Sequence, residues 1–294
     1  MIAEYSAQEI SVGDLLPLLL MNNTTLQKIV FTDIDGTLID MYSGKTEGTD
    51  LLLKKLAMMG IPVVLCSAKT RSEQEYIRNK LRLSDPFIIE NGGAVVIPDG
   101  YFDDLEAAQS IRMKGYRLIE IGGHSNEIRK RLAWFRKELQ INFKGTMDMS
   151  LHEISKRVQI PLPFARRMSK REYGETILEI GFFDLSRLAK VCRRTGLKVI
   201  HGGRYIDITQ GNDKGKATRI LIDLFKRKYK PRGTIFIGLG DSENDLPMLK
   251  LMDIPVLVQK GNGSWCDLKI KNLVHSTGIG PIGWKNSFKL ITTL

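Results

Sequence analysis

Between residues 28 and 89, short apolar runs alternate with helical segments, and no other feature of the sequence constrains the fold as strongly. The apolar runs have the length and composition of buried strands, and they cover 29–32, 61–66 and 87–89. Helices are predicted between them, at 50–59 and 71–81. Strands that are joined through helices run parallel, with right-handed crossovers. We therefore predict an α/β fold built on a parallel sheet.

The same pattern returns near the carboxyl end, after a long stretch of different texture. Helices are predicted there at 214–226 and 246–251, and strands at 234–239 and 254–258. The stretch before them contains Gly-bounded segments, with helices at 128–139 and 185–195 and strands at 177–180 and 197–200. We therefore predict a Rossmann-like parallel-sheet core formed by 27–93 and 204–294, an inserted α+β domain over 94–203, and an N-terminal extension over 1–26.

The cysteines and the apolar runs exclude several classes of protein. Three widely spaced cysteines without a Cys-x-x-Cys pair argue against a disulfide framework or a zinc site. The apolar run at 15–21 follows acidic residues and is too short to span a bilayer, so we expect a cytoplasmic protein outside the membrane. Within the extension, 10–21 is expected to pack as an accessory helix or to dock a partner.

A net charge of +11 suits either nucleic acid or a small, multiply anionic substrate. The basic clusters are short and scattered, and they lack the interleaved aromatic residues of a single-strand-binding groove. We therefore expect a small anionic substrate and no nucleic acid.

The first candidate site follows the strand at 29–32. The sequence Asp33-Ile34-Asp35-Gly36-Thr37 places two carboxylates at i and i+2, which point the same way on an extended chain. They would converge at the carboxyl edge of the sheet, where open α/β folds bind ligands. Close carboxylates repel unless a cation or proton lies between them, and Mg²⁺ prefers oxygen ligands. Taken alone, the segment is also compatible with an acidic turn.

A second acidic segment, 240–245, ends another apolar strand. Adjacent strands would bring its Asp241 and Asp245 to Asp33, although Asp245 could also cap the helix that follows. Ser67 comes directly after the strand at 61–66 and offers a hydroxyl to an oxyanion, and Lys214 opens a helix where it could hold phosphoryl oxygens. Two acidic segments behind two buried strands favour a magnesium-dependent phosphate site.

In this order and spacing, the four segments resemble the motifs of the haloacid dehalogenase superfamily of phosphotransferases. The first motif resembles 33–37, the second Ser67, the third Lys214 and the fourth 240–245. The long insertion before the third motif is similar to that of members with a large α/β cap. The resemblance therefore implies that the inserted domain is a cap that selects the substrate.

Three further segments resemble the mannosyl-3-phosphoglycerate phosphatase family within that superfamily, and they lie at 66–71, 90–94 and 280–284. Members convert mannosyl-3-phosphoglycerate to the compatible solute mannosylglycerate, and some accept the glucosyl analogue. The segment 171–176 is similar to the substrate-facing R-E-x-S-E-P stretch of the family, with Gly174 in place of Ser and Thr176 in place of Pro. This departure leaves the sugar open.

The resemblance implies a phosphomonoester hydrolase that forms an aspartyl-phosphate on Asp33, with Asp35 as general acid and afterwards general base. Asp245 would orient Lys214 or a metal-bound water. The Mg²⁺ ligands would come from Asp33, Asp35 through its backbone carbonyl, Asp241 and Asp245. The phosphoryl oxygens would be held by Ser67, Lys214 and Asn244.

In the cap, basic side chains could grip a glycerate carboxylate, since arginine can do so with two parallel hydrogen bonds. The candidates for substrate contact are Arg166, Arg167, Lys170, Arg171 and Glu175.

Two alternatives stay open. The altered segment 171–176 leaves room for another sugar phosphate or phosphoglycolate as the substrate. The net charge of +11 leaves room for a basic nucleic-acid-binding protein on a lapsed enzyme scaffold, although every motif position is filled.

Overall fold

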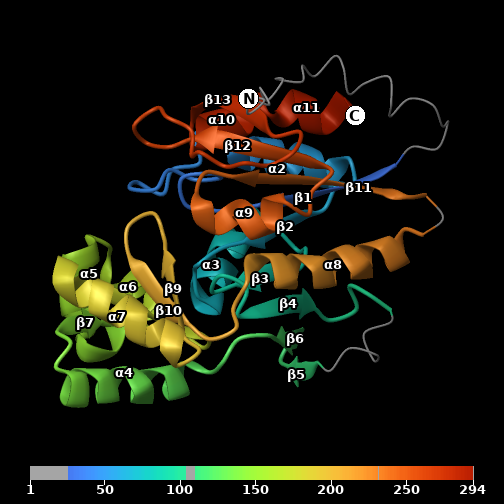
Figure 1. Ribbon diagram of the computed structural model, residues 1–294. Coiled ribbons are helices and arrows are strands. Elements are labelled where there is room, and N and C mark those ends of the chain that lie inside the picture. Colours follow the sequence, from blue (N-terminus) through green and yellow to red (C-terminus); the bar gives the residue numbers. More distant parts are fainter. Residues whose placement is uncertain (1–25, 104–109, 231, 294) are drawn as a thin grey trace, which may run out of the picture.

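The computed structural model describes residues 26–103, 110–230 and 232–293 (Figure 1). The accessory helix expected at 10–21 lies outside the described residues. Within the described ranges, no helix has the length and apolar character needed to cross a membrane.

The larger of the two sheets has nine strands in the order β13-β12-β11-β1-β2-β3-β4-β6-β5. The first six in this order are parallel to one another. In chain order they are β1 (Gln27–Thr32), β2 (Val63–Cys66), β3 (Phe87–Ile89), β11 (Thr234–Gly240), β12 (Ile254–Gln259) and β13 (Val274–Ile279). The predicted parallel sheet is thus confirmed.

Helices cover both faces of the parallel part (Figure 1). One face carries α2 (Thr49–Met58), α3 (Arg71–Leu81), α10 (Pro281–Asn286) and α11 (Phe288–Thr293), and the other carries α8 (Lys214–Lys228) and α9 (Leu246–Leu249). Along β1, Val30 joins the first apolar cluster while Ile29 and Phe31 join the second. Burial on both faces explains why these strands are nearly continuous apolar runs. Each large side chain buried there contributes about 1.5–3 kcal/mol.

Beyond β3 the sheet continues with antiparallel strands, and here the expected domain boundary differs from the structure. The added strands are β4 (Ala94–Pro98), β6 (Tyr116–Glu120) and β5 (Ile111–Met113). Strands β4, β5 and β6 therefore belong to the large sheet, and the inserted unit begins near 121 and not at 94. A tight turn at 90–93 lets β4 fold back onto β3, and strand pairing of this kind leaves no separate signal in the sequence.

The inserted unit contains the second sheet, which is antiparallel with strand order β7-β8-β10-β9. Its strands are β7 (Phe143–Gly145), β8 (Gly174–Ile180), β9 (Lys198–His201) and β10 (Ile206–Thr209). Helices α4 (Ser125–Leu139) and α7 (Phe182–Arg194) pack against one face, and α5 (Leu151–Val158) and α6 (Leu162–Met168) form a separate apolar cluster with β8. Since β10 pairs in this sheet, the unit ends near 210 and not at 203. We call residues 121–210 the cap.

The two connections between core and cap run side by side. The Gly123 amide donates a hydrogen bond of 2.7 Å to the Gln210 carbonyl, and the amide of Gly122 donates one of 2.9 Å to the Gly93 carbonyl. A Cβ atom on Gly122 would lie 2.1 Å from Asn212 Oδ1, so only glycine allows this approach. The connections therefore hold the cap against the carboxyl ends of the parallel strands.

Candidate active site

The site forms where the strand order reverses around β1. The chain continues from β1 to β2 on one side and returns much later through β11 on the other, which leaves a crevice at the carboxyl ends of the strands. In the parallel register, Thr32 at the end of β1 lies opposite Leu65 of β2 and Leu239 of β11. The residues that follow these three strands therefore meet at one edge of the sheet.

A buried cluster of one ammonium and three carboxylates lies at this edge. Lys214 Nζ donates to Asp33 Oδ1 at 2.8 Å and to Asp245 Oδ1 at 2.7 Å. The other oxygen of Asp245 accepts the backbone amide hydrogens of Asp241 and Ser242, at 3.1 and 3.2 Å. Asp33, Asp241 and Asp245 each offer an oxygen, and these oxygens lie within 4.8 Å of one another. The two acidic segments of the sequence and Lys214 are thus brought together.

Burial and like charge make this cluster electrostatically unfavourable on its own. Burial raises the pKa of Asp33 well above its ordinary value; Lys214 opposes this shift, while Asp245 and Asp241 add to it. Burial and the neighbouring Asp245 raise the pKa of Asp241 to about 7. Burial alone would lower the pKa of Lys214, but Asp245 and Asp33 outweigh it and raise this pKa.

The cluster has the chemistry of a divalent-cation site. When all three carboxylates are ionised, they exceed the single ammonium by two negative charges, and all three aspartates are buried. The donors are oxygens only, as a hard ion such as Mg²⁺ prefers. The Asp35 carboxylate lies outside this group of three. Asp33, Asp241 and Asp245 therefore fit Mg²⁺.

Without metal, the free energy of unfolding should depend on pH through Asp241. A carboxyl group whose pKa is raised by folding stabilises the fold when protonated, and this contribution is lost as the pH rises toward about 7. In EDTA-treated protein, we expect Asp241→Asn to raise the melting temperature at pH 8, and to raise it by less at pH 5. With saturating Mg²⁺ at pH 8, the wild type should instead melt at a higher temperature than Asp241→Asn. A ligand at 100 times its Kd raises the free energy of unfolding of the protein that binds it by about 2.7 kcal/mol. Calorimetric melts at both pH values check this, and a pH-independent difference between the variant and the wild type would contradict it.

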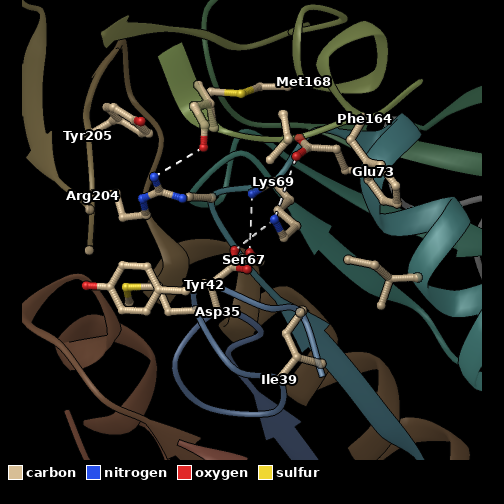
Figure 2. Close-up of a pocket in the computed structure, with 18 of the residues that line it drawn as sticks. Asp35, Ile39, Tyr42, Ser67, Lys69, Glu73, Phe164, Met168, Arg204 and Tyr205 are labelled. Atoms are coloured by element: carbon tan, nitrogen blue, oxygen red, sulfur yellow. Dashed lines mark hydrogen bonds and ion pairs between the residues drawn. The ribbon is translucent and has the colours of Figure 1, made fainter. Parts of the chain in front are cut away.

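Asp35 and Ser67 lie beside the cluster, joined by a residue that was not among the predicted site residues. Lys69 Nζ is 3.0 Å from Asp35 Oδ2 and 3.7 Å from Glu73 Oε1. Burial alone would lower the pKa of Lys69, but these two carboxylates raise it. Ser67 Oγ accepts the Lys69 amide hydrogen at 3.2 Å, and Figure 2 shows Asp35, Ser67 and Lys69 gathered in the pocket. Lys69 lies in the 66–71 segment, but only the tertiary pairing with Asp35 shows that it faces the site.

The turn at 90–92 connects the strand ends to Lys214. Glu90, Asn91 and Gly92 have consecutive positive φ angles of 47°, 57° and 87°. The Glu90 amide donates to the Lys69 carbonyl and the Asn91 amide to the Ser67 carbonyl, both at 3.0 Å. A Cβ on Gly92 would lie 2.2 Å from the Asp213 carbonyl oxygen, so a glycine is needed where the turn meets the start of α8. This packing accounts for the Glu-Asn-Gly-Gly segment that the sequence contains.

The same turn also binds the cap. The Glu90 carboxylate accepts the backbone amide hydrogens of Glu172 and Tyr173 at 2.7 and 2.9 Å. Burial raises the pKa of Glu90 to about 7, although Arg171 and these two hydrogen bonds oppose the shift. Asn91 donates to Asp207 Oδ2 at 2.9 Å and accepts from Asn244 Nδ2 at 3.4 Å. Cap and phosphate-site residues are therefore linked through two side chains of one turn.

A cavity of about 540 Å³ opens above the cluster, between core and cap (Figure 2). Its core side includes Asp33, Asp35, Ser67, Lys69 and Asn244. Its cap side includes Val158, Phe164, Met168, Arg171, Thr176, Arg204 and Tyr205. Helix α6 closes one wall by packing on α3, where the Tyr76 and Phe164 rings meet edge to face at 5.0 Å.

The structure changes the roles expected for the cap candidates. Arg171 lines the cavity, but its guanidinium is buried against Asp207 at 3.0 Å and donates to the Ala68 carbonyl at 2.9 and 3.2 Å. Glu175 is buried inside the cap, where it accepts from Arg129 Nε at 2.8 Å and Thr146 Oγ1 at 2.6 Å. Four of the five candidates do not line the cavity, so the expectation that they face the substrate is not met for Arg166, Arg167, Lys170 and Glu175.

Comparison with known proteins identifies the family. Residues 30–144 match the family model of haloacid dehalogenase-like hydrolases. A glucosyl-3-phosphoglycerate/mannosyl-3-phosphoglycerate phosphatase of Methanococcoides burtonii is 37% identical over 268 residues, which cover 89% of this chain and 96% of the relative. This chain belongs to the mannosyl-3-phosphoglycerate phosphatase family. It is a phosphoric monoester hydrolase of the haloacid dehalogenase type.

Further comparisons agree with this assignment. A mannosyl-3-phosphoglycerate phosphatase of Pyrococcus furiosus is 33% identical to this family member over 87% of the chain and 98% of the relative. A phosphatase of the haloalkanoate superfamily from Bacteroides thetaiotaomicron has a TM-score of 0.63 at 18% identity, covering 94% of this chain and 99% of that one. The structure of Thermoplasma acidophilum 0175 has a TM-score of 0.62 at 20% identity, covering 90% of this chain and all of that one. At these identities the two structures support the fold, a core sheet with an inserted cap.

Proposed function

We propose that this phosphatase hydrolyses mannosyl-3-phosphoglycerate or its glucosyl analogue in the cytoplasm, with Mg²⁺ as cofactor. The observation that supports this proposal most strongly is the buried cluster of Asp33, Lys214, Asp245 and Asp241. The cluster opens on a cavity large enough for a sugar and a glycerate. The names of the relatives from Methanococcoides burtonii and Pyrococcus furiosus support this substrate class.

In the proposed first step, an Asp33 carboxylate oxygen attacks phosphorus in line. A bond forms between that oxygen and phosphorus, the phosphate ester bond breaks, and the departing glycerate oxygen takes a proton from Asp35. Lys214 binds the other oxygen of Asp33 and thereby fixes the carboxylate for attack. Ser67, Lys69 and Asn244 line the cavity around this point, where they would hold phosphoryl oxygens.

In the second step, a water molecule attacks the aspartyl-phosphate and gives its proton to Asp35. The bond between Asp33 and phosphorus breaks, which releases inorganic phosphate and restores the ionised carboxylate of Asp33. When bound, Mg²⁺ would offset the negative charge of the carboxylates and of the transferring phosphoryl group. Phosphoryl transfer needs chiefly positioning and charge stabilisation, which this small set of side chains supplies.

A different sugar phosphate or phosphoglycolate is the second candidate substrate, and one contact favours it. Thr176, which stands where the family stretch has Pro, lines the cavity and donates from Oγ1 to Asp207 Oδ1 at 2.6 Å. A proline there would lack this donor and would leave Asp207 Oδ1, which also pairs with Arg171, without this hydrogen bond.

Phosphate release from a substrate panel tests the proposal. The panel contains mannosyl- and glucosyl-3-phosphoglycerate, sucrose 6-phosphate, phosphoglycolate and hexose phosphates, each with Mg²⁺. We expect kcat/KM to be highest for a glycosyl-3-phosphoglycerate. Preference for another ester would overturn the substrate assignment and retain the chemistry. Absence of hydrolysis together with salt-sensitive, near-micromolar binding to DNA or RNA would favour the nucleic-acid alternative.

A further inference from the structure

We propose that Arg204, at the tip of the β9–β10 hairpin, is a specificity-determining residue that binds the carboxylate of the substrate while the phosphate lies at Asp33. This inference rests on the proposed function, because it requires a phosphate ester that also carries a carboxylate. The sequence-based candidates Arg166, Arg167 and Lys170 do not line the cavity, and Arg171 is paired with Asp207.

The charges that line the cavity single out Arg204. Among the described residues that line it, the basic side chains are Lys69, Lys80, Arg171 and Arg204. Lys69 is paired with Asp35 and Glu73, and Arg171 is paired with Asp207. Arg204 has no carboxylate within 4.0 Å among the described residues, and its Nη2 donates a hydrogen bond of 3.2 Å to the Val158 carbonyl. Its positive charge is therefore free to meet a second anion of a ligand.

The hairpin tip brings Arg204 over the catalytic loops. The Gly202 amide donates to the Tyr205 carbonyl at 2.9 Å, which closes the turn. A Cβ on Gly203 would lie 2.4 Å from the Met41 methyl carbon, and this same atom lies 2.9 Å from a Cβ built on Gly36, the residue after Asp35. Strand β9 also packs near the 3-10 turn η2 (Glu243–Asp245), which carries Asn244 and Asp245.

Two aromatic rings hold the guanidinium in place. Its carbon lies 5.6 Å from the centroid of Tyr42 of the core and 5.5 Å from that of Tyr205 of the cap. Figure 2 shows Arg204 between these two tyrosines, on the side of the pocket opposite Phe164 and Glu73. A guanidinium that is fixed before binding loses less conformational freedom when it binds. Its planar fork matches a carboxylate with two parallel hydrogen bonds.

Lys80 also has no carboxylate partner within 4.0 Å in the described part of the chain, but its setting is different. It is exposed on α3 and also lines a second hollow formed with residues 43–47, Asp50 and Leu81. Its charge is a point on a flexible stem, without the flanking rings. Lys80 therefore offers a matched control, since Lys80→Met removes one positive charge from the same cavity.

The test compares two ligands that differ only in the carboxylate. With Mg²⁺ present and p-nitrophenyl phosphate as reporter, inhibition constants are measured for 3-phosphoglycerate and glycerol 3-phosphate, and calorimetric titration gives the same ratio without turnover. We expect the wild type to bind 3-phosphoglycerate about 10- to 100-fold more tightly, as for charge-assisted hydrogen bonds. Arg204→Met should bring the ratio close to one, Arg204→Lys should give an intermediate ratio, and Lys80→Met should keep it.

Arg204→Met should leave the melting temperature near its wild-type value, because the side chain is exposed. The inference would be overturned by a wild-type affinity ratio near one or by a ratio that persists in Arg204→Met. It would also be overturned if Lys80→Met lowered the ratio as much as Arg204→Met does. Turnover of the glycosyl-3-phosphoglycerates is measured separately on the wild type. Its absence overturns the proposed function, whereas the ratio of the two ligands tests Arg204 whichever ester the enzyme hydrolyses.

Discussion

Asp33→Asn is expected to lower kcat by about 10⁴-fold or more, as for the loss of an essential nucleophile. An amide has no ionised oxygen to attack phosphorus, and the substitution also removes one of the three carboxylates that fit Mg²⁺. Asparagine has nearly the same shape and can still accept the Lys214 hydrogen bond, so the fold should be retained. Phosphate release from a glycosyl-3-phosphoglycerate and from p-nitrophenyl phosphate measures the loss.

Asp35→Asn is the matched comparison for this variant. Asp35 lies outside the carboxylate cluster, and its proposed role is to move a proton. p-Nitrophenolate leaves without needing a proton, so Asp35→Asn should slow the first step less with p-nitrophenyl phosphate than with a sugar ester. Asp33→Asn should be inactive with both. Activity that survives in Asp33→Asn would show that another group attacks phosphorus.

Lys214→Met is expected to lower both stability and activity. Its ammonium is 1% exposed and binds two buried carboxylates, and breaking a buried pair of this kind costs about 3–5 kcal/mol. Activity should fall by about 10²–10³-fold, because a fixed positive charge at the transferring group is lost. Denaturant unfolding in EDTA and steady-state kinetics in Mg²⁺ measure the two effects.

The pH dependence of the Lys214→Met effect follows from Asp33. The pKa of Asp33 is raised in the folded wild type although Lys214 opposes the shift, so loss of Lys214 raises it further. A raised pKa stabilises the fold at low pH and withdraws this contribution as the pH rises. The variant should therefore be less destabilised at pH 5 than at pH 8.

Lys216→Met, two residues along the same helix, controls for the loss of a lysine from α8. Lys216 is exposed, and its replacement should change the free energy of unfolding by about 0.5 kcal/mol or less. Equal destabilisation by the two variants would mean that the carboxylate contacts of Lys214 do not carry the effect.

The helices and strands of the core were largely predictable because local rules and burial agree there. Helix α3 was predicted at 71–81 and has these bounds, since Thr70 and Glu73 form a capping box that marks its start. The strands β1, β2 and β11 are buried on both faces, which makes each an apolar run that stops where the polar site begins. Parallel register then brings Asp33, Ser67 and Asp241 to one edge.

The boundary and the roles within the cap were not predictable in the same way. β4 pairs with β3 through a tight turn, and no local pattern shows that this hairpin extends the large sheet. Arg171 pairs with Asp207 across 36 positions and Arg129 with Glu175 across 46, so neither pair lies at the spacing of a helix or strand. Of these residues, Arg171 and Glu175 were expected to contact the substrate, and only the tertiary structure shows their charged partners within the protein.

By itself, the sequence determined which core strands form and which carboxylates follow them. Periodicity and the parallel topology suffice for this, because residues at the ends of adjacent strands must lie together. The order and spacing of the motifs added Lys214, which opens a helix and does not end a strand. Only the tertiary structure decided which positive charges are neutralised and which remain free to meet a substrate. That outcome depends on how the cap rests on the core, where Met41 meets Gly203 and Tyr42 meets Arg204 across the mouth of the cavity.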